Sequence, residues 1–371
     1  MRNLIWIGNR LSDINECKNL FSISVTLYGE STSSNISFDK YRINNNAMNL
    51  EVDQFINQTL MKLIEKEDNS KIMFYNPKKV YSLNNLIKKH SICLNDYFLL
   101  ELLSDKISCH SLFDTVVNFA PYIIMNGKDI RFCNLKKIFP NYQKFVVQYA
   151  KSSGGFGTFL LTENDEEICK SLENNHRYLV SAYIENNISF NFHVVIGKSD
   201  YLIFPPSIQI IQENQTRLSY RGADFINTAN IDKNNAMEIV KTIAEKLKIY
   251  GYRGIVGLDM IQECFTKKLY LVELNCRFQG SSFLVNKALK DCNLISLQEI
   301  NIAAFNGEKL ENILPNDFKI DYGSIFYYKK EEAKLSIENA DFECRELDGL
   351  NYYSNSEDFA YLYKDIYIKK P

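Results

Sequence analysis

Short apolar runs alternate with a helical pattern over the first hundred residues. The strand-like runs are Leu4–Gly8, Ile23–Tyr28 and Ile72–Tyr75, and the apolar positions of Val52–Ile64 recur at helical spacing. Strand–helix–strand order at this spacing is typical of an open α/β domain. The segment contains no Gly-x-Gly-x-x-Gly motif, so the pattern does not indicate a dinucleotide site there.

The pattern changes from Phe145 onward, where short strands follow one another with few helices between them. The clearest helix covers Asp232–Tyr250, whose apolar residues share one face, and Gly251 follows at the position that usually ends a helix. From about Leu314 the chain is rich in tyrosine and strand-like. The strand-like runs of this region are Phe145–Tyr149, Thr158–Thr162, Tyr178–Ile184, Phe190–Ile196, Gly254–Ile261 and Leu269–Leu274.

Composition narrows the classes of function. The 371 residues carry a formal net charge of −2 and are 46% hydrophobic, which suits a globular chain of about two or three domains. A sequence-independent nucleic-acid binder would carry a basic excess, so that class is disfavoured. No apolar run approaches the ~18 residues of a membrane span, and no signal-peptide core follows Met1. The 9 cysteines form no Cys-x-x-Cys pair, so we expect a cytoplasmic protein with reduced thiols.

A glycine-rich segment separates the first two strands of the second region. It reads Lys-Ser-Ser-Gly-Gly-Phe-Gly over residues 151–157 and is followed by Thr158. It is not a P-loop, because no Gly-Lys-Ser/Thr follows and the next element is a strand. The backbone N–H groups of such a loop can hold a polyphosphate. Taken alone, an isolated glycine motif more often means a flexible hairpin tip.

Two acidic residues face each other in the last predicted hairpin. If the turn centres on Thr266, Asp259 lies directly opposite Glu273. Opposed like charges destabilise a sheet ladder unless something neutralises them. A hard divalent cation would do so, and it also accepts an amide oxygen such as that of Asn275, which shares the face of Glu273. The alternative is a pair of acids on a solvent-exposed edge, but the apolar neighbours favour a metal site.

Two arginines are candidates for binding charged substrate groups. Arg277 follows the acidic strand, where a guanidinium can hold a phosphoryl group or a carboxylate, or can cap the strand ends. Arg221 lies in a predicted loop, where it could hold a substrate carboxylate or take part in ordinary loop packing. The sequence lacks the residue patterns that other catalytic mechanisms would need. The 4 histidines form no metal-binding pattern, His193 is expected to be structural or a substrate contact, and Cys276 has no His–Asp partner.

Four segments together resemble the ATP-grasp superfamily of carboxylate–amine ligases. The most specific part is a Glu-x-Asn-x-Arg pattern with an upstream aspartate. The resemblance covers roughly residues 104–307. The segments are V-Q-Y-A-K-S-S-G-G-F-G-T (147–158), V-S-A-Y-I-E (180–185), G-I-V-G-L-D (254–259) and E-L-N-C-R-F-Q-G-S (273–281).

The resemblance implies an α/β (α+β) architecture of three parts. Residues 1–103 would form a pre-ATP-grasp α/β domain. Residues 104–313 would form a two-lobed ATP-grasp domain, with the small lobe at about 145–184 and the large lobe at 185–313. Residues 314–371 would form a small strand-rich C-terminal segment.

The resemblance also implies ATP as a cofactor. Lys106 matches a lysine at the head of the domain that contacts phosphates. The family's second lysine is replaced by Gln148, and Lys151 lies nearby as a substitute. Glu185 is the closest acid for the ribose. The phosphate loop corresponds to Ser153, Gly154, Gly155, Gly157 and Thr158, and the hinge that meets adenine to Ser181, Ala182, Tyr183 and Ile184.

The implied activity is ATP-dependent formation of an amide or peptide bond through an acyl phosphate, releasing ADP and phosphate. Asp259, Glu273 and Asn275 match ligands of one or two Mg²⁺ ions, and Arg277 matches a residue near the transferred phosphate. The partners would be small carboxylates and amines, with amino acids or peptides favoured, and neither nucleic acid nor membrane; no oligomeric state is predicted. The alternative is an ATP-binding assembly or regulatory protein with little catalysis, which the loss of lysine at Gln148 slightly favours.

Overall fold

The N-terminal domain is a parallel sheet covered by helices. Its elements are β1 (Leu4–Gly8), η1 (Leu11–Leu20), β2 (Ile23–Thr26), β3 (Asn35–Ser37), α2 (Val52–Lys66), β4 (Lys71–Phe74) and α4 (Asn85–His90). The strand order is β3-β2-β1-β4, and every neighbouring pair is parallel. Parallel neighbours need crossover connections, which η1 supplies between β1 and β2 and α2 supplies between β3 and β4. The strands and the helix that the pattern predicts here are confirmed.

The computed structural model describes most of the chain, including all of the central region from Asn84 to Ser152. The described residues are 3–27, 31–38, 52–77, 84–152, 157–214, 217–327, 343–347, 351–354 and 359–368.

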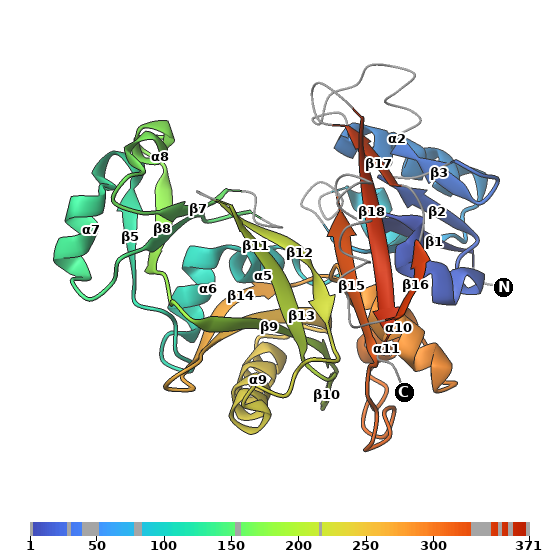
Figure 1. Ribbon diagram of the computed structural model, residues 1–371. Helices are drawn as coiled ribbons and strands as arrows, with labels where there is room; N and C mark the ends of the chain where they lie inside the picture. Colours follow the sequence, from blue (N-terminus) through green and yellow to red (C-terminus); the bar gives the residue numbers. More distant parts are fainter. Residues whose placement is uncertain are drawn as a thin grey trace.

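A long antiparallel sheet runs through the second region (Figure 1). Its first part consists of α5 (Tyr97–Ser104), α6 (Lys106–Phe113), β5 (Tyr122–Asn126), η3 (Gly127–Asp129), α7 (Phe132–Ile138), β6 (Phe145–Tyr149), β7 (Thr158–Leu161), α8 (Glu166–Ser171) and β8 (Arg177–Ala182). Its second part consists of β9 (Asn187–Ile196), β10 (Tyr201–Ile203), β11 (Ser207–Asn214), β12 (Arg217–Asp224), α9 (Lys233–Ile249), β13 (Gly254–Glu263), β14 (Leu269–Asn275), α10 (Ser282–Asp291) and α11 (Leu297–Asn306).

The order of strands in this sheet defines two lobes. Along the main path it is β14-β13-β9-β11-β12-β7-β6-β8-β5. β7, β6, β8 and β5 form the small lobe with α7 and α8, and the other strands form the large lobe. The small lobe begins before residue 145, because β5 pairs with β8 from Tyr122 onward.

Helix α9 packs against the large lobe through the apolar face that the sequence pattern predicts. Val240, Ile243 and Leu247 recur at helical spacing and are fully buried against the large lobe. Burial of each such side chain contributes about 1.5–3 kcal/mol. The side chain of Asp232 caps the first turn by accepting a backbone N–H, and Gly251 ends the helix at a φ of 82°. The predicted helix is therefore confirmed.

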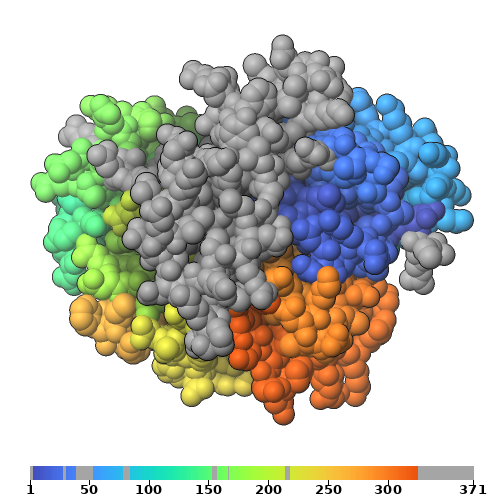
Figure 2. Space-filling model, turned by 45° about the vertical axis from the view of Figure 1, so that its right-hand side comes forward, coloured from blue at the N-terminus to red at the C-terminus, as the bar shows by residue number. Residues whose placement is uncertain are grey.

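A shared core joins the N-terminal domain to the large lobe. The ring of Phe278 lies 5.3 Å from that of Trp6 and 6.2 Å from that of Tyr75. The backbone N–H of Phe278 also donates to the carbonyl of Tyr75 at 3.1 Å. Figures 1 and 2 show the blue N-terminal domain against the orange segment that carries α10 and α11. The domain boundary at residue 103 stays a prediction, and the core crosses it.

The C-terminal segment extends the same sheet. β15 (Tyr322–Tyr327) pairs with β12, and β18 (Phe359–Ile368) pairs with β15. Two further strands, β16 (Glu343–Leu347) and β17 (Asn351–Ser354), also pair with β18. The segment is thus strand-rich where the structure describes it.

The contacts of Phe278 predict that truncating this side chain destabilises the whole chain. Phe278→Ala removes a ring that is 2% exposed. We expect its free energy of unfolding to fall by about 3–5 kcal/mol, because transfer and cavity costs add. Phe278→Leu is the matched control and retains most of the volume. Chemical denaturation followed by circular dichroism measures both variants, and equal stability of Phe278→Ala and wild type would contradict the shared core.

Candidate active site

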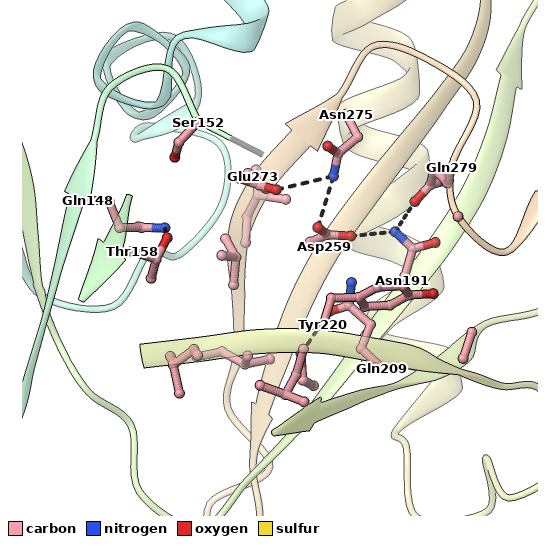
Figure 3. A pocket seen from close by; sticks show the side chains of 18 of the residues that line it. Gln148, Ser152, Thr158, Asn191, Gln209, Tyr220, Asp259, Glu273, Asn275 and Gln279 are labelled. Carbon is pink, nitrogen blue, oxygen red and sulfur yellow. Dashed lines mark hydrogen bonds between the residues drawn. The ribbon is translucent and has the colours of Figure 1, made fainter. Parts of the chain in front are cut away.

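A cavity of about 1160 Å³ opens between the two lobes and reaches the N-terminal domain. Strands β6, β8 and β11 line one end, and β9, β13 and β14 line the middle. Residues that follow β1, β2 and β4 line the other end. Figure 3 shows that polar side chains from several strands point into this space. The cavity therefore brings together residues that lie far apart in the sequence.

The predicted acidic pair is present in the β13–β14 hairpin. Asp259 pairs directly with Glu273 in the strand register, and both side chains line the cavity. The register shifts next to this pair, because Met260 pairs with Leu271 and leaves Val272 as an extra residue. Such a β-bulge turns the bulged strand locally and is frequent beside functional sites. The facing carboxylates are confirmed, although the ladder between them and the turn is irregular.

The amide of Asn275 bridges the two carboxylates (Figure 3). Its Nδ2 donates to Asp259 at 2.8 Å and to Glu273 at 3.3 Å. Its Oδ1 accepts a hydrogen bond from Arg277 at 2.9 Å. The N–H groups of the Asn275 amide therefore point at the two carboxylates, whose negative charge they partly offset. For Asn275 to bind a metal through Oδ1, its amide must turn over, which a cation between the carboxylates would favour electrostatically.

Lys106 supplies further positive charge. Its Nζ lies 2.8 Å from a carboxylate oxygen of Glu273 and also donates to the backbone carbonyl of Ser152 at 3.0 Å. The side chain of Lys106 is only 3% exposed. Burial alone would raise the pKa of Glu273, but Lys106, Arg277 and a hydrogen bond with Asp259 together lower it. Burial and the charge of Glu273 raise the pKa of Asp259 to about 7.

This donor set suits a hard cation. Two carboxylates and an amide oxygen are the ligands that Mg²⁺ prefers. Asp259, Glu273 and Asn275 together could hold such an ion. Within the described residues, no group of three or more His, Cys, Asp and Glu side chains forms another metal cluster.

Asn191 and Gln279 complete the polar cluster and were not singled out from the sequence. Asn191 Nδ2 donates to a carboxylate oxygen of Asp259 and to Gln279 Oε1, the latter at 2.6 Å (Figure 3). Asn191 Oδ1 and Gln279 Nε2 are buried without a hydrogen-bond partner. Gly257 makes room for the Gln279 amide, because a Cβ there would lie 2.1 Å from its Cδ. The alternation of β9 could have placed Asn191 opposite Asp259, as the register now shows.

The expected hinge lies at the far end of the cavity. Ser181, Ala182, Tyr183 and Ile184 all line it, together with Val146 on β6 and Leu271 on β14. Apolar side chains beside a hinge backbone suit a planar base. Glu185, the expected ribose ligand, is 53% exposed and does not line the cavity. Glu213 does line it, and it accepts a hydrogen bond from the Tyr183 hydroxyl at 3.2 Å.

The glycine-rich loop is described only at its ends. Ser153, Gly154 and Gly155 lie outside the described residues, whereas Gly157 adopts a φ of 71° against the Tyr149 ring. Gln148 and Thr158 line the cavity and pair with each other at 3.4 Å. Lys151 does not replace the missing lysine, because it pairs with Glu101 and does not line the cavity.

Arg277 reaches the cavity, and Arg221 does not. Arg277 Nη1 donates to the carbonyl of Phe278 at 3.0 Å, which fixes the guanidinium beside the acidic hairpin. On β12 it is Tyr220, the neighbour of Arg221, that lines the cavity. The register of β12 shifts at this point, because Tyr220 pairs with Ile211 and Gly222 pairs with Ile210, which leaves Arg221 as the extra residue. Arg221 lies on this strand rather than in the predicted loop, and it does not line the cavity.

The side chains of His193 and Cys276, which could suggest a different catalytic mechanism, are unreactive. His193 is fully buried, burial lowers its pKa to about 3, and its Nε2 lies 3.2 Å from the Ser282 hydroxyl. Burial raises the pKa of Cys276 strongly, so its thiol stays protonated. Both observations agree with the expectation that neither residue is a catalyst.

A protein-family model described as an ATP-grasp domain matches residues 103–281. This range contains the lysine of α6, the hinge, the acidic hairpin and Arg277. Residues 103–281 are an ATP-grasp domain. The ATP-grasp resemblance predicted from the sequence motifs is confirmed.

Solved ATP-grasp structures share the fold over nearly the whole chain. The biotin carboxylase domain of the 2-oxoglutarate carboxylase from Hydrogenobacter thermophilus has a TM-score of 0.68 at 15% identity, covering 99% of this chain and 86% of that one. N5-carboxyaminoimidazole synthetase from Staphylococcus aureus has a TM-score of 0.62 at 15% identity, with 100% and 94% covered. Biotin carboxylase from Campylobacter jejuni has a TM-score of 0.68 at 14% identity, with 99% and 87% covered.

These likenesses confirm the predicted α/β fold class of the chain. None of the curated proteins matches the chain in sequence. Among the described helices, none combines the length and apolar character that crossing a bilayer requires.

Proposed function

We propose that this ATP-grasp protein is an ATP-dependent carbon–nitrogen ligase. It would phosphorylate a carboxylate with ATP, and an amine would then attack the acyl phosphate to give an amide. Membership of residues 103–281 in the ATP-grasp family supports ATP-dependent ligation. Of the similar structures, the Hydrogenobacter domain is a complex with MgADP, ADP and bicarbonate, and the Staphylococcus synthetase is a complex with ADP.

One observation carries the proposal. Asp259 and Glu273 face each other within a cavity whose far end is an apolar hinge, and Lys106 and Arg277 lie beside them. Phosphoryl transfer needs little covalent chemistry from the protein, because positioning and charge stabilisation supply most of the effect. The hinge end suits adenine, and the charged middle suits polyphosphate.

Each group then has a role that its position supports. Asp259, Glu273 and Asn275 would hold one or two Mg²⁺ ions, which would neutralise phosphate charge. Lys106 would move from Glu273 to a phosphate oxygen when a metal ion takes its place. Arg277 would stabilise charge that develops on the transferred group. Glu213, which lines the cavity, would contact the ribose in place of Glu185.

The reducing environment expected for this enzyme agrees with its cysteines. The cysteines from Cys17 to Cys292 are free, and Cys17, Cys109, Cys169 and Cys276 among them are buried. Free thiols persist where thiols are kept reduced. These thiols support the proposal of a cytoplasmic protein.

The products of the reaction test the proposal directly. Purified protein is incubated with Mg-ATP and a panel of carboxylates and amines, and the nucleotide products are separated by chromatography. We expect ADP and phosphate, formed in equal amounts and only when an acceptable carboxylate is present. Lys106 and Arg277 lie beside the acidic pair and not at the hinge, so charge should develop on the γ-phosphoryl group.

Two outcomes would contradict this mechanism. Stoichiometric AMP and pyrophosphate would mean that the carboxylate is adenylated instead. Tight Mg-ATP binding without turnover on any pair in the panel would favour the alternative of a nucleotide-dependent assembly protein.

A further inference from the structure

The N-terminal domain supplies one wall of the cavity. Asn9 and Arg10 follow β1, Leu27 follows β2, and Tyr75 and Asn76 follow β4, and all five line the cavity. β2, β1 and β4 are neighbours in a parallel sheet. Open α/β sheets bind ligands in the crevice outside the carboxyl ends of their strands. The wall therefore has the usual position of a ligand site, yet no sequence motif indicates it.

Arg10 is the positively charged residue of this wall, and Asp13 holds it in place. It is 7% exposed, and its Nη2 lies 3.5 Å from Asp13 Oδ1. Asp13 Oδ2 also accepts the backbone N–H of Arg10 at 3.2 Å. Asp13 is itself buried, so the pair is shielded from water. The guanidinium of Arg10 is buried and lines the cavity, and Asp13 holds both this group and the Arg10 backbone. Arg10 is therefore preorganised to bind an anion.

Two tyrosines line the cavity near the acidic hairpin and this wall, and one of them, Tyr75, belongs to the wall. Burial and Asp13 raise the pKa of Tyr75 to about 12, against the opposing charges of Arg277 and Arg10. Tyr75 is thus within electrostatic reach of both arginines. Tyr220 lines the cavity from β12, and its ring would lie 3.3 Å from a Cβ at Gly280. The two arginines therefore border one space from different sides.

We propose that Arg10 binds a carboxylate of the substrate that does not react, such as the carboxylate of an α-amino acid or the second carboxylate of a dicarboxylic acid. This assignment rests on the proposed ligase function and makes Arg10 a residue that determines specificity. Arg277 then serves the reacting group beside the metal, while Arg10 fixes the distance and orientation of the remainder of the substrate.

The charge at this wall favours a carboxylate over a phosphate group. Arg10 already shares its charge with Asp13, so the pair presents little net positive charge. A carboxylate carries one negative charge and matches a single guanidinium in bidentate geometry. A phosphate group carries ≈ −1.5 to −2 charges near neutral pH and would need further cations. Asn9 and Asn76, the other polar residues of the wall, are neutral.

The test compares carboxylates with their carboxamides. The probes are the proteinogenic L-amino acids, succinate, glutarate, the matching carboxamides and inorganic phosphate, titrated by calorimetry into the full-length protein saturated with Mg-ADP. We expect at least one carboxylate to bind, and its carboxamide to bind ~10-fold or more weakly, because the charge-assisted bidentate pair is lost.

Two variants connect this discrimination to Arg10. Arg10→Met combined with Asp13→Asn removes both charges, so no carboxylate is left buried alone, and Asn retains an oxygen for the Arg10 backbone N–H. We expect carboxylate and carboxamide to bind this variant equally. Arg10→Lys retains the charge without the planar fork and should lose part of the discrimination. Arg131→Met, on the exposed surface of the small lobe, is the matched control.

Several results would overturn the assignment. They are binding of no carboxylate in the panel, equal binding of carboxamides by wild type, tighter binding of inorganic phosphate, and full discrimination in the double variant. If Arg221→Met lost the discrimination and the double variant did not, Arg221 would be the residue that binds the substrate carboxylate. Calorimetry of Mg-ADP alone separates the two proposals, because failure to bind Mg-ADP contradicts the ligase function, whereas lost discrimination with intact Mg-ADP binding concerns Arg10 only.

Discussion

Glu273→Ala abolishes turnover and leaves the fold intact. The carboxylate of Glu273 lies opposite Asp259, and without it the proposed metal site keeps a single acid. Metal ions contribute several kcal/mol to charge stabilisation in phosphoryl transfer, so we expect ADP release to fall by ~10³-fold or more. The same substitution frees the Nζ of Lys106, which lies 2.8 Å from Glu273. Initial rates of ADP release and circular dichroism measure the two effects.

The control for this variant lies in the same hairpin. Glu263→Ala removes an acid at the end of β13 that does not line the cavity, and its ADP release should match that of wild type. Full activity of Glu273→Ala would refute the metal assignment. A loss in both variants would point to damage of the hairpin rather than to a lost ligand.

Arg277→Ala slows the chemical step by ~10²–10³-fold, the range expected for losing one charge-stabilising donor. The guanidinium is fixed by Asn275 Oδ1 and the Phe278 carbonyl, so it cannot be replaced by a mobile side chain. Binding of ATP should change little, because the proposed adenine site is at the hinge. Single-turnover rates give the first quantity and calorimetry with Mg-ATP gives the second.

Arg277→Lys separates charge from geometry at this position. Lysine keeps a cation but lacks the planar fork that reaches both acceptors. We expect an intermediate rate with unchanged ATP affinity. If Arg277→Ala instead weakened ATP binding as much as it slowed turnover, Arg277 would be a ground-state phosphate ligand and its role in transfer would be refuted.

The prediction of the acidic pair assumed a turn centred on Thr266. The register beside the turn, Ile261 with Tyr270 and Met260 with Leu271, would by itself place Val272 opposite Asp259, and it is the bulge that brings Glu273 there. The extra residue Val272 could not be predicted in the same way. A bulge depends on how β14 packs between β13 and the helices, and a count of residues in the turn does not contain that information.

Sequence reasoning was weaker where the site depends on distant segments. Arg10 lies 267 positions before Arg277 in the sequence, and no spacing rule connects them. Lys151 was proposed because it lies near the position of the missing lysine, and Arg221 because it lies in a predicted loop, but their neighbours Ser152 and Tyr220 line the cavity instead. Ser152 follows the end of β6 and Arg221 lies at a register shift of β12, and neither local geometry can be read from proximity in sequence.

Trp6 gives the protein an optical probe of one specific place. It is the single tryptophan of the chain, it is fully buried, and its ring lies 5.3 Å from that of Phe278, directly after Arg277. Its fluorescence therefore reports on the contact between the N-terminal domain and the segment that carries Arg277, and no added label is needed. Closure of the cavity around a substrate would change the emission if it moved Phe278. Events confined to the small lobe would leave the emission unchanged, so the two kinds of motion can be followed separately in stopped-flow experiments.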